Sequence, residues 1–253
     1  MPQTATRLAI VTGTSSGIGE ALAQQLLDQG WTVVGIARRG GRFDHPQFHH
    51  VAIDLSAVGE LLAALDAGVG PMVRDSTLAR IGLVNNAADV ALLGQLDRVD
   101  PTAMLSAFAT NTVAPTVLAG WVVRTASTSV PLRIVTISSG AAIVPLPGMG
   151  AYAATKAAVR MAGMVLAAEI DARGGDVDRD ATIWSYEPGV VATPMQTAVR
   201  ESSVESVPIV QVFKDLHASG QLRDPAEPAT EIAAYLNGDG HPRFSEQRFM
   251  LEP

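Results

Sequence analysis

The chain has 253 residues, of which 47% are hydrophobic and 17% charged, and its formal net charge is −7 at pH 7. This composition is typical of a compact soluble protein and excludes a disordered tail. The negative net charge argues against a nucleic-acid partner, and no apolar run is long enough to span a bilayer. The sequence has no cysteine, which excludes disulfides and thiol chemistry. Because it opens without an export signal, we expect a cytoplasmic protein.

The histidines do not indicate a metal site. There are five of them, and none shows HExxH spacing or belongs to a Cys/His ligand pattern. We therefore expect no bound metal.

Short apolar runs rich in Val and Ile alternate along the chain with helical patterns. Such runs are typical of strands buried on both faces, and the stretches between them are long enough for crossover helices. The predicted strands are RLAIVT, TVVGIA, HHVAID, IGLVNNA, LRIVTIS and ATIWSYE, and the predicted helices span 17–29, 57–67, 101–127, 152–173, 209–219 and 227–236. This order predicts an α/β fold: a Rossmann-like, doubly wound parallel sheet of about seven strands with helices on both faces.

The domain organisation is predicted to be simple. No internal repeat and no proline-rich linker divides the sequence, so we expect a single domain over residues 1–253. Residues 194–225 are the least regular part of the second half and follow the sixth predicted strand. Because ligands bind beyond the carboxyl ends of such strands, we expect a substrate lid there.

A glycine-rich turn follows the first predicted strand, in TGTSSGIG at residues 12–19. Gly13 permits a sharp turn, Gly17 lets the main chain approach a pyrophosphate, and Gly19 allows close helix packing. The amino end of the next helix offers free N–H groups to phosphates. The pattern indicates a dinucleotide site, although methyltransferases also use a glycine-rich first turn.

The end of the second predicted strand favours NADPH over NADH. Enzymes that prefer NAD place an acidic residue about 20 residues after the turn, but here Ala37 is followed by Arg38 and Arg39. Guanidinium groups bind a 2′-phosphate by charge-assisted hydrogen bonds; the alternative is two solvated surface arginines. Asp54 is expected to bind the adenine amino group or to cap the next helix.

Five motifs occur in a characteristic order: TGxxxGIG, NNA, a serine thirteen residues before the tyrosine of YxxxK, that YxxxK, and PG followed by Thr. Together, over about residues 8–195, they resemble the short-chain dehydrogenase/reductase family in its compact single-domain branch. GIARR, ISSGAA and PGVVATPMQ resemble the group of sepiapterin and benzil reductases, which reduce diketone-like carbonyls with NADPH. The resemblance implies an NADPH-dependent oxidoreductase that reduces a ketone or diketone to an alcohol.

The catalytic chemistry predicted from the residues agrees with this resemblance. Tyr152 and Lys156 lie one helical turn apart, and a neighbouring cation lowers the pKa of a phenol from about 10. Tyr152 then acts as general acid and base, while Ser139 binds the same carbonyl oxygen. Both residues are therefore expected to be catalytic.

The resemblance implies further roles and adds Lys156 and Asn111 to the expected catalytic residues. Lys156 holds the nicotinamide ribose, and Asn111 holds a water that connects the lysine to solvent; a helix bend before Pro115 is the alternative reason for Asn111. The expected cofactor-binding residues are Gly13, Ser15, Ser16, Gly17, Ile18, Gly19, Arg38, Arg39, Asp54, Leu55, Asn85, Ala87, Tyr152, Lys156, Pro188, Gly189, Val191 and Thr193.

The sequence departs from the family pattern at two positions. Ala88 occupies the position of the glycine in the usual NNAG motif. Its extra methyl group is tolerated where the main chain does not need a positive φ. Glu187, just before the Pro-Gly pair, faces the substrate or pairs with a neighbouring base. The residues expected to line an apolar substrate pocket are Ile143, Pro147, Met149 and Met195.

Two further expectations concern function class and assembly. The alternative to an enzyme is a non-catalytic NADP(H)-sensing protein on the same fold, which the Tyr152 and Lys156 pair disfavours. The helices at 101–127 and 152–173 expose small residues and form a subunit interface in the resembling enzymes. We therefore expect a homodimer or a tetramer.

Overall fold

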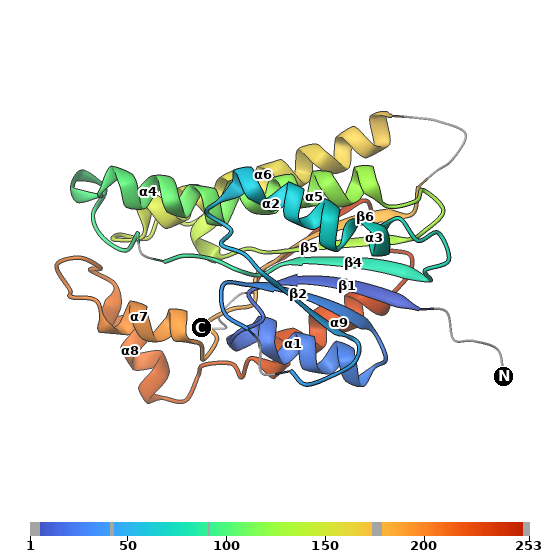
Figure 1. Ribbon diagram of the computed structural model, residues 1–253. Helices are drawn as coiled ribbons and strands as arrows, with labels where there is room; N and C mark the ends of the chain where they lie inside the picture. Colours follow the sequence, from blue (N-terminus) through green and yellow to red (C-terminus); the bar gives the residue numbers. More distant parts are fainter. Residues whose placement is uncertain (1–5, 41–42, 91, 174–178, 250–253) are drawn as a thin grey trace.

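The computed structural model describes residues 6–40, 43–90, 92–173 and 179–249. Within them the strands form a single seven-stranded sheet in the order β3-β2-β1-β4-β5-β6-β7, and every neighbouring pair is parallel (Figure 1). The strands are β1 (Arg7–Thr12), β2 (Thr32–Ala37), β3 (Phe48–Ala52), β4 (Arg80–Asn85), β5 (Leu132–Ile137), β6 (Ala181–Tyr186) and β7 (Phe244–Gln247). The predicted fold class is confirmed.

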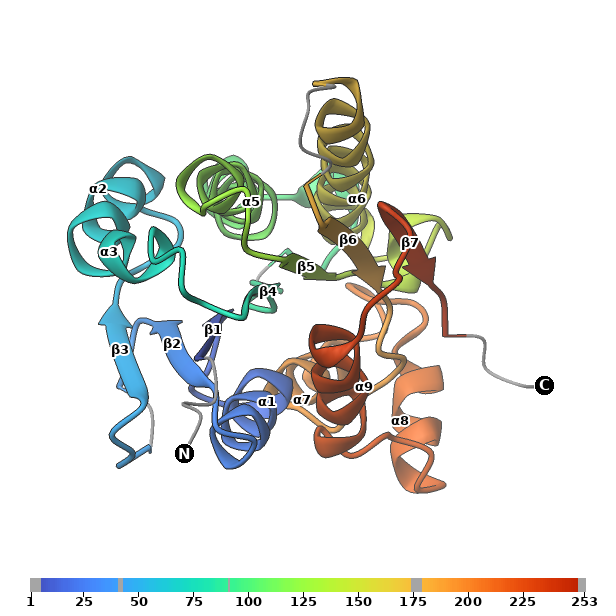
Figure 2. The ribbon, with the colours of Figure 1, turned by 90° about the vertical axis from the view of Figure 1, so that its right-hand side faces the viewer.

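Helices cover both faces of the sheet, and further helices lie beyond the carboxyl ends of the strands. Figure 2 shows α1 (Gly17–Asp28) and α9 (Ala226–Asn237) on one face, with α2 (Val58–Gly68), α3 (Gly70–Val73), α5 (Ala114–Thr125) and α6 (Gly150–Ala172) on the other. In Figure 1, α4 (Pro101–Phe108), α7 (Pro194–Glu201) and α8 (Val210–Ala218) lie toward the carboxyl ends of the strands. The strand order reverses between β1 and β4, and a crevice opens at such a point.

The edge strand β3 differs from the prediction. Its apolar run predicts burial on both faces, but its burial is only partial. The reason is its position: β3 has one neighbour, β2, while the central strand β1 is buried almost throughout. Burial on both faces therefore holds for the inner strands.

The predicted helix 101–127 is also interrupted. A π-helical turn (Ala109–Val113) separates α4 from α5, and the N–H of Ala114 donates to the carbonyl oxygen of Ala109. Pro115 explains the interruption because it has no N–H to bond the carbonyl of Asn111 four residues earlier. The helices α3 and α7 and the strand β7 were not among the elements located from the sequence.

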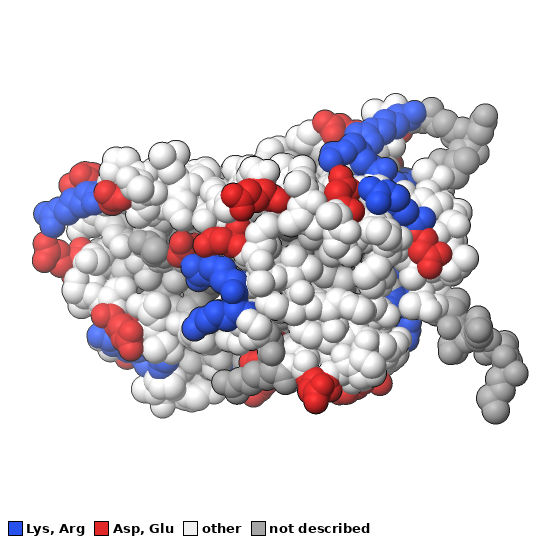
Figure 3. Space-filling view, viewed as in Figure 1, with Lys and Arg blue, Asp and Glu red and all other residues white. Residues whose placement is uncertain are grey.

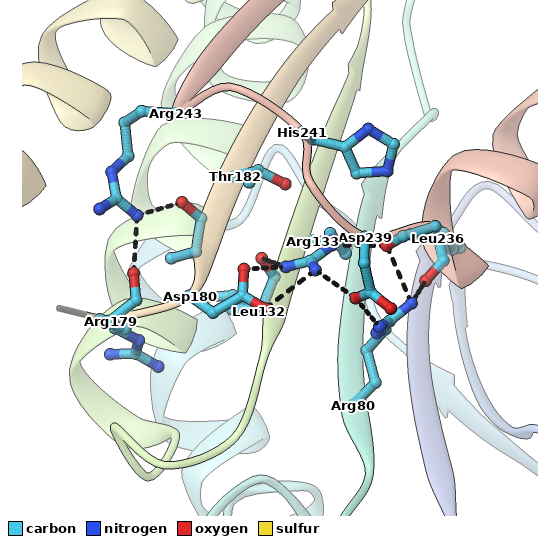
Figure 4. A network of polar contacts seen from close by, with 12 residues as sticks. Arg80, Leu132, Arg133, Arg179, Asp180, Thr182, Leu236, Asp239, His241 and Arg243 are labelled. Carbon is cyan, nitrogen blue, oxygen red and sulfur yellow. Dashed lines mark hydrogen bonds and ion pairs between the residues drawn. The ribbon is translucent and has the colours of Figure 1, made fainter.

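A network of arginines holds the carboxyl-terminal segment at the amino ends of the strands (Figure 4). The buried Arg133 of β5 donates to both carboxylate oxygens of Asp180, at 2.7 and 3.0 Å, and to Asp239 at 3.1 Å. Arg80 of β4 donates to the carbonyl oxygen of Leu236 at 2.9 Å. These bonds fix the chain between α9 and β7.

No helix in the described ranges is long and apolar enough to cross a membrane.

Candidate active site

A cavity of about 750 Å³ lies at the carboxyl ends of the inner strands. Its walls come from the turn after β1, the ends of β2, β5 and β6, the start of α6, and the helices α7 and α8. Figure 3 shows a hollow on this side of the molecule with basic and acidic side chains gathered beside it. This crevice is where the topology predicts a ligand.

The glycine turn at one end of the cavity has the shape of a phosphate cradle. Gly13 and Gly17 have φ of 76° and 61°, which favours glycine at both positions. A Cβ on Gly19 would stand 2.4 Å from the carbonyl oxygen of Gly13 and 2.5 Å from Nδ2 of Asn86, so the close approach is to the turn and to the residue that follows β4. Ser16 precedes α1 without a side-chain cap, which leaves the helix N–H groups available for an anion.

Arg38 and Arg39 lie on the cavity wall, exposed, directly after β2. Asp54 lies on the same wall, and its carboxylate is 4.0 Å from the guanidinium of Arg38. Asp54 does not cap α2, because its oxygen accepts from the N–H and hydroxyl of Ser56 at 2.9 and 2.8 Å. These bonds to Ser56 hold the pKa of Asp54 below its usual value.

The predicted catalytic residues meet at the centre of the cavity. Ser139 follows β5, Tyr152 and Lys156 lie on α6, and all three line the same wall. The ammonium nitrogen of Lys156 is 5.8 Å from the centre of the Tyr152 ring. It donates to the carbonyl oxygen of Ile137 at 2.8 Å.

Burial sets the acidities of this pair. It raises the pKa of Tyr152 to about 12, against the lowering effect of a hydrogen bond with Ser139, and it lowers the pKa of Lys156 to about 8. The predicted fall in the tyrosine pKa is therefore wrong for this protein. The physical reason is that desolvation disfavours both charged forms, while the ammonium of Lys156 is turned toward the carbonyl oxygen of Ile137.

Asn111 lies behind the cavity rather than on its wall, on the π-helical turn, and is 1% exposed. Its Oδ1 accepts from the N–H of Asp89 at 2.6 Å, and its Nδ2 donates to the carbonyl oxygen of Asp89 at 2.8 Å. Nδ2 also donates to the hydroxyl of Thr155 at 3.2 Å, beside Lys156. The asparagine thus joins the loop after β4 to α6.

Most of the expected cofactor-binding residues line the cavity, but two do not. Gly19 packs beneath the turn, and Asn85 points away, donating to the carbonyl oxygen of Pro115 at 3.3 Å. Its neighbour Asn86 takes the expected place and donates to the carbonyl oxygen of Thr12 at 2.9 Å. The remaining expected residues on the wall are Gly13, Ser15, Ser16, Gly17, Ile18, Arg38, Arg39, Asp54, Leu55, Ala87, Tyr152, Lys156, Pro188, Gly189, Val191 and Thr193.

Ala88 lines the cavity without strain. No non-glycine residue in the described ranges has a positive φ, so the methyl group of Ala88 is tolerated as predicted.

The apolar end of the cavity is built from partly different residues than expected. Met149 and Met195 line it, but Ile143 and Pro147 do not, and Ile143 is 43% exposed. The short turn Gly140–Ala142 directs the following residues outward, toward solvent. The apolar lining missed by the sequence analysis is Val90, Leu146, Val190, Val199, Ile209, Val212, Phe213, Leu216 and Phe249.

One sequence signal could have found part of this lining. Ile209, Val212, Phe213 and Leu216 follow the i, i+3, i+4, i+7 pattern of a helix face, within the predicted helix 209–219. The face turns toward the cavity rather than toward the sheet. Phe249 gave no signal, because it comes after the last strand.

The loop after β6 closes the cavity on the side of Thr193. Thr193 caps α7, and its methyl carbon would stand 3.0 Å from a Cβ on Gly17, so the loop after β6 nearly touches the glycine turn. Arg223 secures this loop, donating to the carbonyl oxygen of Pro188 at 3.0 Å. Glu187 precedes Pro188 and lines the cavity half-buried, where burial raises its pKa.

The fold and this site define a nicotinamide-dependent oxidoreductase, and comparison with known proteins gives its family. Residues 7–203 match the family model described as short chain dehydrogenase. The chain therefore belongs to the short-chain dehydrogenase/reductase family, whose members use NAD(P)(H) and act on small carbonyl substrates.

Individual relatives agree with the resemblance seen in the sequence. The chain is 31% identical to benzil reductase ((S)-benzoin forming) of Bacillus cereus, over 94% of this chain and 96% of that protein. It is 29% identical to sepiapterin reductase of Bos taurus, over 92% and 90%. The crystal structure of a short-chain dehydrogenase/reductase from Burkholderia vietnamiensis aligns with a TM-score of 0.65 and 32% identity, over 79% of this chain and 93% of that one. The predicted family and enzyme class are confirmed.

Proposed function

We propose that the protein is an NADPH-dependent reductase that converts a ketone or diketone carbonyl to a secondary alcohol, reversibly. The observation that carries this proposal is the meeting of Ser139, Tyr152 and Lys156 on one wall of the cavity whose other end is the glycine turn. Tyr152 and Lys156 are almost fully buried yet border the cavity, so their polar groups have a ligand-sized space beside them.

The proton chemistry follows from the acidities. With a pKa of about 12, Tyr152 is a neutral phenol at neutral pH and holds the proton that the carbonyl oxygen receives. Ser139 binds the same oxygen and stabilises the charge that develops on it. The charge of Lys156 beside the ring favours the phenolate that is left. The nicotinamide, when bound, supplies the hydride to the carbonyl carbon.

The residues that would hold the cofactor fit a dinucleotide. The N–H groups at the start of α1 and the glycine turn suit the pyrophosphate, and the loop from Pro188 to Thr193 suits the carboxamide. Lys156 would bind the nicotinamide ribose, and Asn111 would hold the proposed water near it.

The preference for NADPH rests on charge at the end of β2. Arg38 and Arg39 are exposed on the wall, and the position of the usual acidic residue is taken by the buried Ala37. Replacing either arginine by alanine is expected to lower kcat/KM about tenfold or more with NADPH and to leave it unchanged with NADH, since hydrogen bonds to charged groups contribute roughly 1.5–3 kcal/mol. A wild-type preference for NADH overturns this part of the proposal.

The apolar end of the cavity supports an apolar or aromatic substrate. The helices α7 and α8, within residues 194–225, form much of this end, and we assign that segment as the substrate lid of one domain spanning residues 1–253. The names of the relatives, benzil reductase and sepiapterin reductase, support a carbonyl with a second polar group near it.

The direct test is NADPH oxidation, followed at 340 nm, with a panel of ketones, diketones and pterins. We expect turnover with at least one aromatic ketone or diketone, and Tyr152→Phe should abolish it while leaving NADPH binding nearly intact. NADPH binding without turnover by the wild type would instead favour the sensing protein. Retained activity in Tyr152→Phe would contradict the assigned acid.

A homodimer or tetramer is proposed on the exposed face of α5 and α6. Met161 and Val165 of α6 are 52% and 48% exposed, and Ala154 and Ala157 continue the same apolar stripe. An apolar face of this kind usually packs against a partner. Light scattering tests it: a monomer at micromolar concentration contradicts the assignment.

A further inference from the structure

Glu187 places a carboxylate beside the groups that bind the carbonyl. It directly follows β6, and a Cβ on Gly140 would stand 2.9 Å from its Oε1. Gly140 is the residue after Ser139, whose side chain hydrogen-bonds with that of Tyr152. Glycine at position 140 thus leaves room for the carboxylate to lie against the same wall as the catalytic hydroxyl groups.

The fold gives this carboxylate two main-chain hydrogen bonds, from the N–H groups of Gly140 and Phe249, but burial still raises its pKa. Among the described residues, none forms an ion pair with Glu187 within 4.0 Å. Arg248 attracts it electrostatically, but the guanidinium of Arg248 is 3.4 Å from Glu246, which also accepts from Arg160 at 2.6 and 2.7 Å. An ionised carboxylate has about four acceptor positions, so two main-chain donors leave Glu187 able to accept from a ligand as well.

The cavity that Glu187 lines also has apolar walls, which include Leu146, Met149 and Phe213. Phe249 lies beside this position, since its ring would stand 2.7 Å from a Cβ on Gly189 and its N–H bonds to Glu187. In such a lining a single carboxylate orients a ligand strongly, because the ligand's donor group and the carboxylate both lose water when they bond. A ligand bearing an anion at this point is repelled.

We infer that Glu187 is a specificity residue that accepts a hydrogen bond from a hydroxyl or ammonium group carried next to the reacting carbonyl. The inference rests on the proposed carbonyl reduction and narrows its substrate class to α-hydroxy or α-amino ketones with an apolar remainder. Within this class the donor and the carbonyl oxygen bind at adjacent points of one wall, the oxygen at Ser139 and Tyr152 and the donor at Glu187.

The test compares three aryl ketones that differ only at the neighbouring carbon: acetophenone, 2-hydroxyacetophenone and α-aminoacetophenone. The wild type should show a higher kcat/KM for one or both donor-bearing ketones. Glu187→Gln should lower this preference about tenfold, and Glu187→Leu more, when each kcat/KM is divided by that of acetophenone in the same variant, as expected for loss of a charged hydrogen bond. The matched control is Glu201→Gln, which removes the same charge from an exposed position outside the cavity.

A binding measurement separates this inference from the proposed activity. Calorimetric titration with 1-phenylethane-1,2-diol, 2-amino-1-phenylethanol and 1-phenylethanol needs no turnover. Tighter binding of the diol or the amino alcohol by the wild type than by Glu187→Gln, without any turnover, supports the role of Glu187 and contradicts the reductase. Turnover with the same substrate order in wild type and both variants, at equal melting temperature, overturns the role of Glu187 and leaves the reductase standing. A larger loss for the hydroxy than for the amino ketone identifies the hydroxyl group as the donor, and the reverse identifies the ammonium.

Discussion

The ammonium nitrogen of Lys156 donates to the carbonyl oxygen of Ile137 at 2.8 Å, so this bond joins the amino-terminal part of α6 to the last residue of β5. Lys156 is only 3% exposed, and burial lowers its pKa from 10.5 to about 8. Between these two values the unfolded chain binds more protons than the folded protein. Burial of the charged ammonium therefore destabilises the fold by its full amount below about pH 8, and this destabilisation decreases as the pH rises toward 10.5.

Lys156→Met should consequently stabilise the protein while it damages function. At pH 7 we expect the free energy of unfolding to rise on the order of 1–3 kcal/mol, less the lost hydrogen bond, and the gain to narrow by pH 10. Urea denaturation at pH 7 and pH 10 measures both values, and turnover should fall steeply in the same variant. A gain that is independent of pH would show that the charge of Lys156 is not the cause.

Asn111 should matter for stability as well as for turnover. Asn111→Ala removes two hydrogen bonds to the part-buried main chain of Asp89, and each such bond contributes about 0.5–1.5 kcal/mol. We expect a clear fall in the urea midpoint. Thr116→Ala is the control, because its exposed hydroxyl donates to the carbonyl oxygen of Thr112 on the π-helical turn just before α5. Equal midpoints for Asn111→Ala and Thr116→Ala would contradict the bridging role.

The features that sequence predicted well are those fixed by local chemistry. The glycines of the first turn adopt the positive φ that their type allows, and Tyr152 and Lys156 share a face because α6 is regular between them. The inner strands were located because burial on both faces makes them uniformly apolar. The site could therefore be assembled from motif spacing and the rule that ligands bind at the carboxyl ends of the strands.

The features that sequence missed depend on contacts between distant segments. Asn85 and Asn86 are the same residue type, and only their contacts with distant segments, the carbonyl oxygens of Pro115 and Thr12, show which one faces away from the cavity. The tyrosine acidity was misjudged because spacing reveals the neighbouring charge but not the depth of burial. β7 is short and weakly apolar, and its pairing with β6 relies on the arginines that hold the preceding loop.

Those arginines predict an acid sensitivity. Arg133 is fully buried, and its hydrogen bond holds the pKa of Asp180 below the usual value, so this bond stabilises the fold above about pH 4 and is lost as the pH falls toward the folded pKa. Asp180→Ala leaves a buried guanidinium short of one partner and should cost roughly 1–3 kcal/mol at pH 7. Arg133→Met should cost less, because it removes the buried charge as well. Thermal melts from pH 3 to pH 7 check the order, and the variants should lose less stability on acidification than the wild type.

Arg223 links the end of the proposed lid to the cofactor loop, and its geometry needs a guanidinium. One nitrogen donates to Pro188, another bonds to Glu231, and the group lies 5.4 Å from the Phe249 ring, while the main chain of Arg223 pairs with the loop at Val191. Lysine has a single nitrogen and cannot make these contacts together. We therefore expect Arg223→Lys to weaken NADPH binding several-fold, measured by fluorescence titration, because the loop around Gly189 loses its brace. Glu227→Gln is the matched control, since its contact with Arg223 is 3.4 Å and exposed. Unchanged affinity in Arg223→Lys, with the fold intact, would mean that the main-chain pairing alone holds the loop.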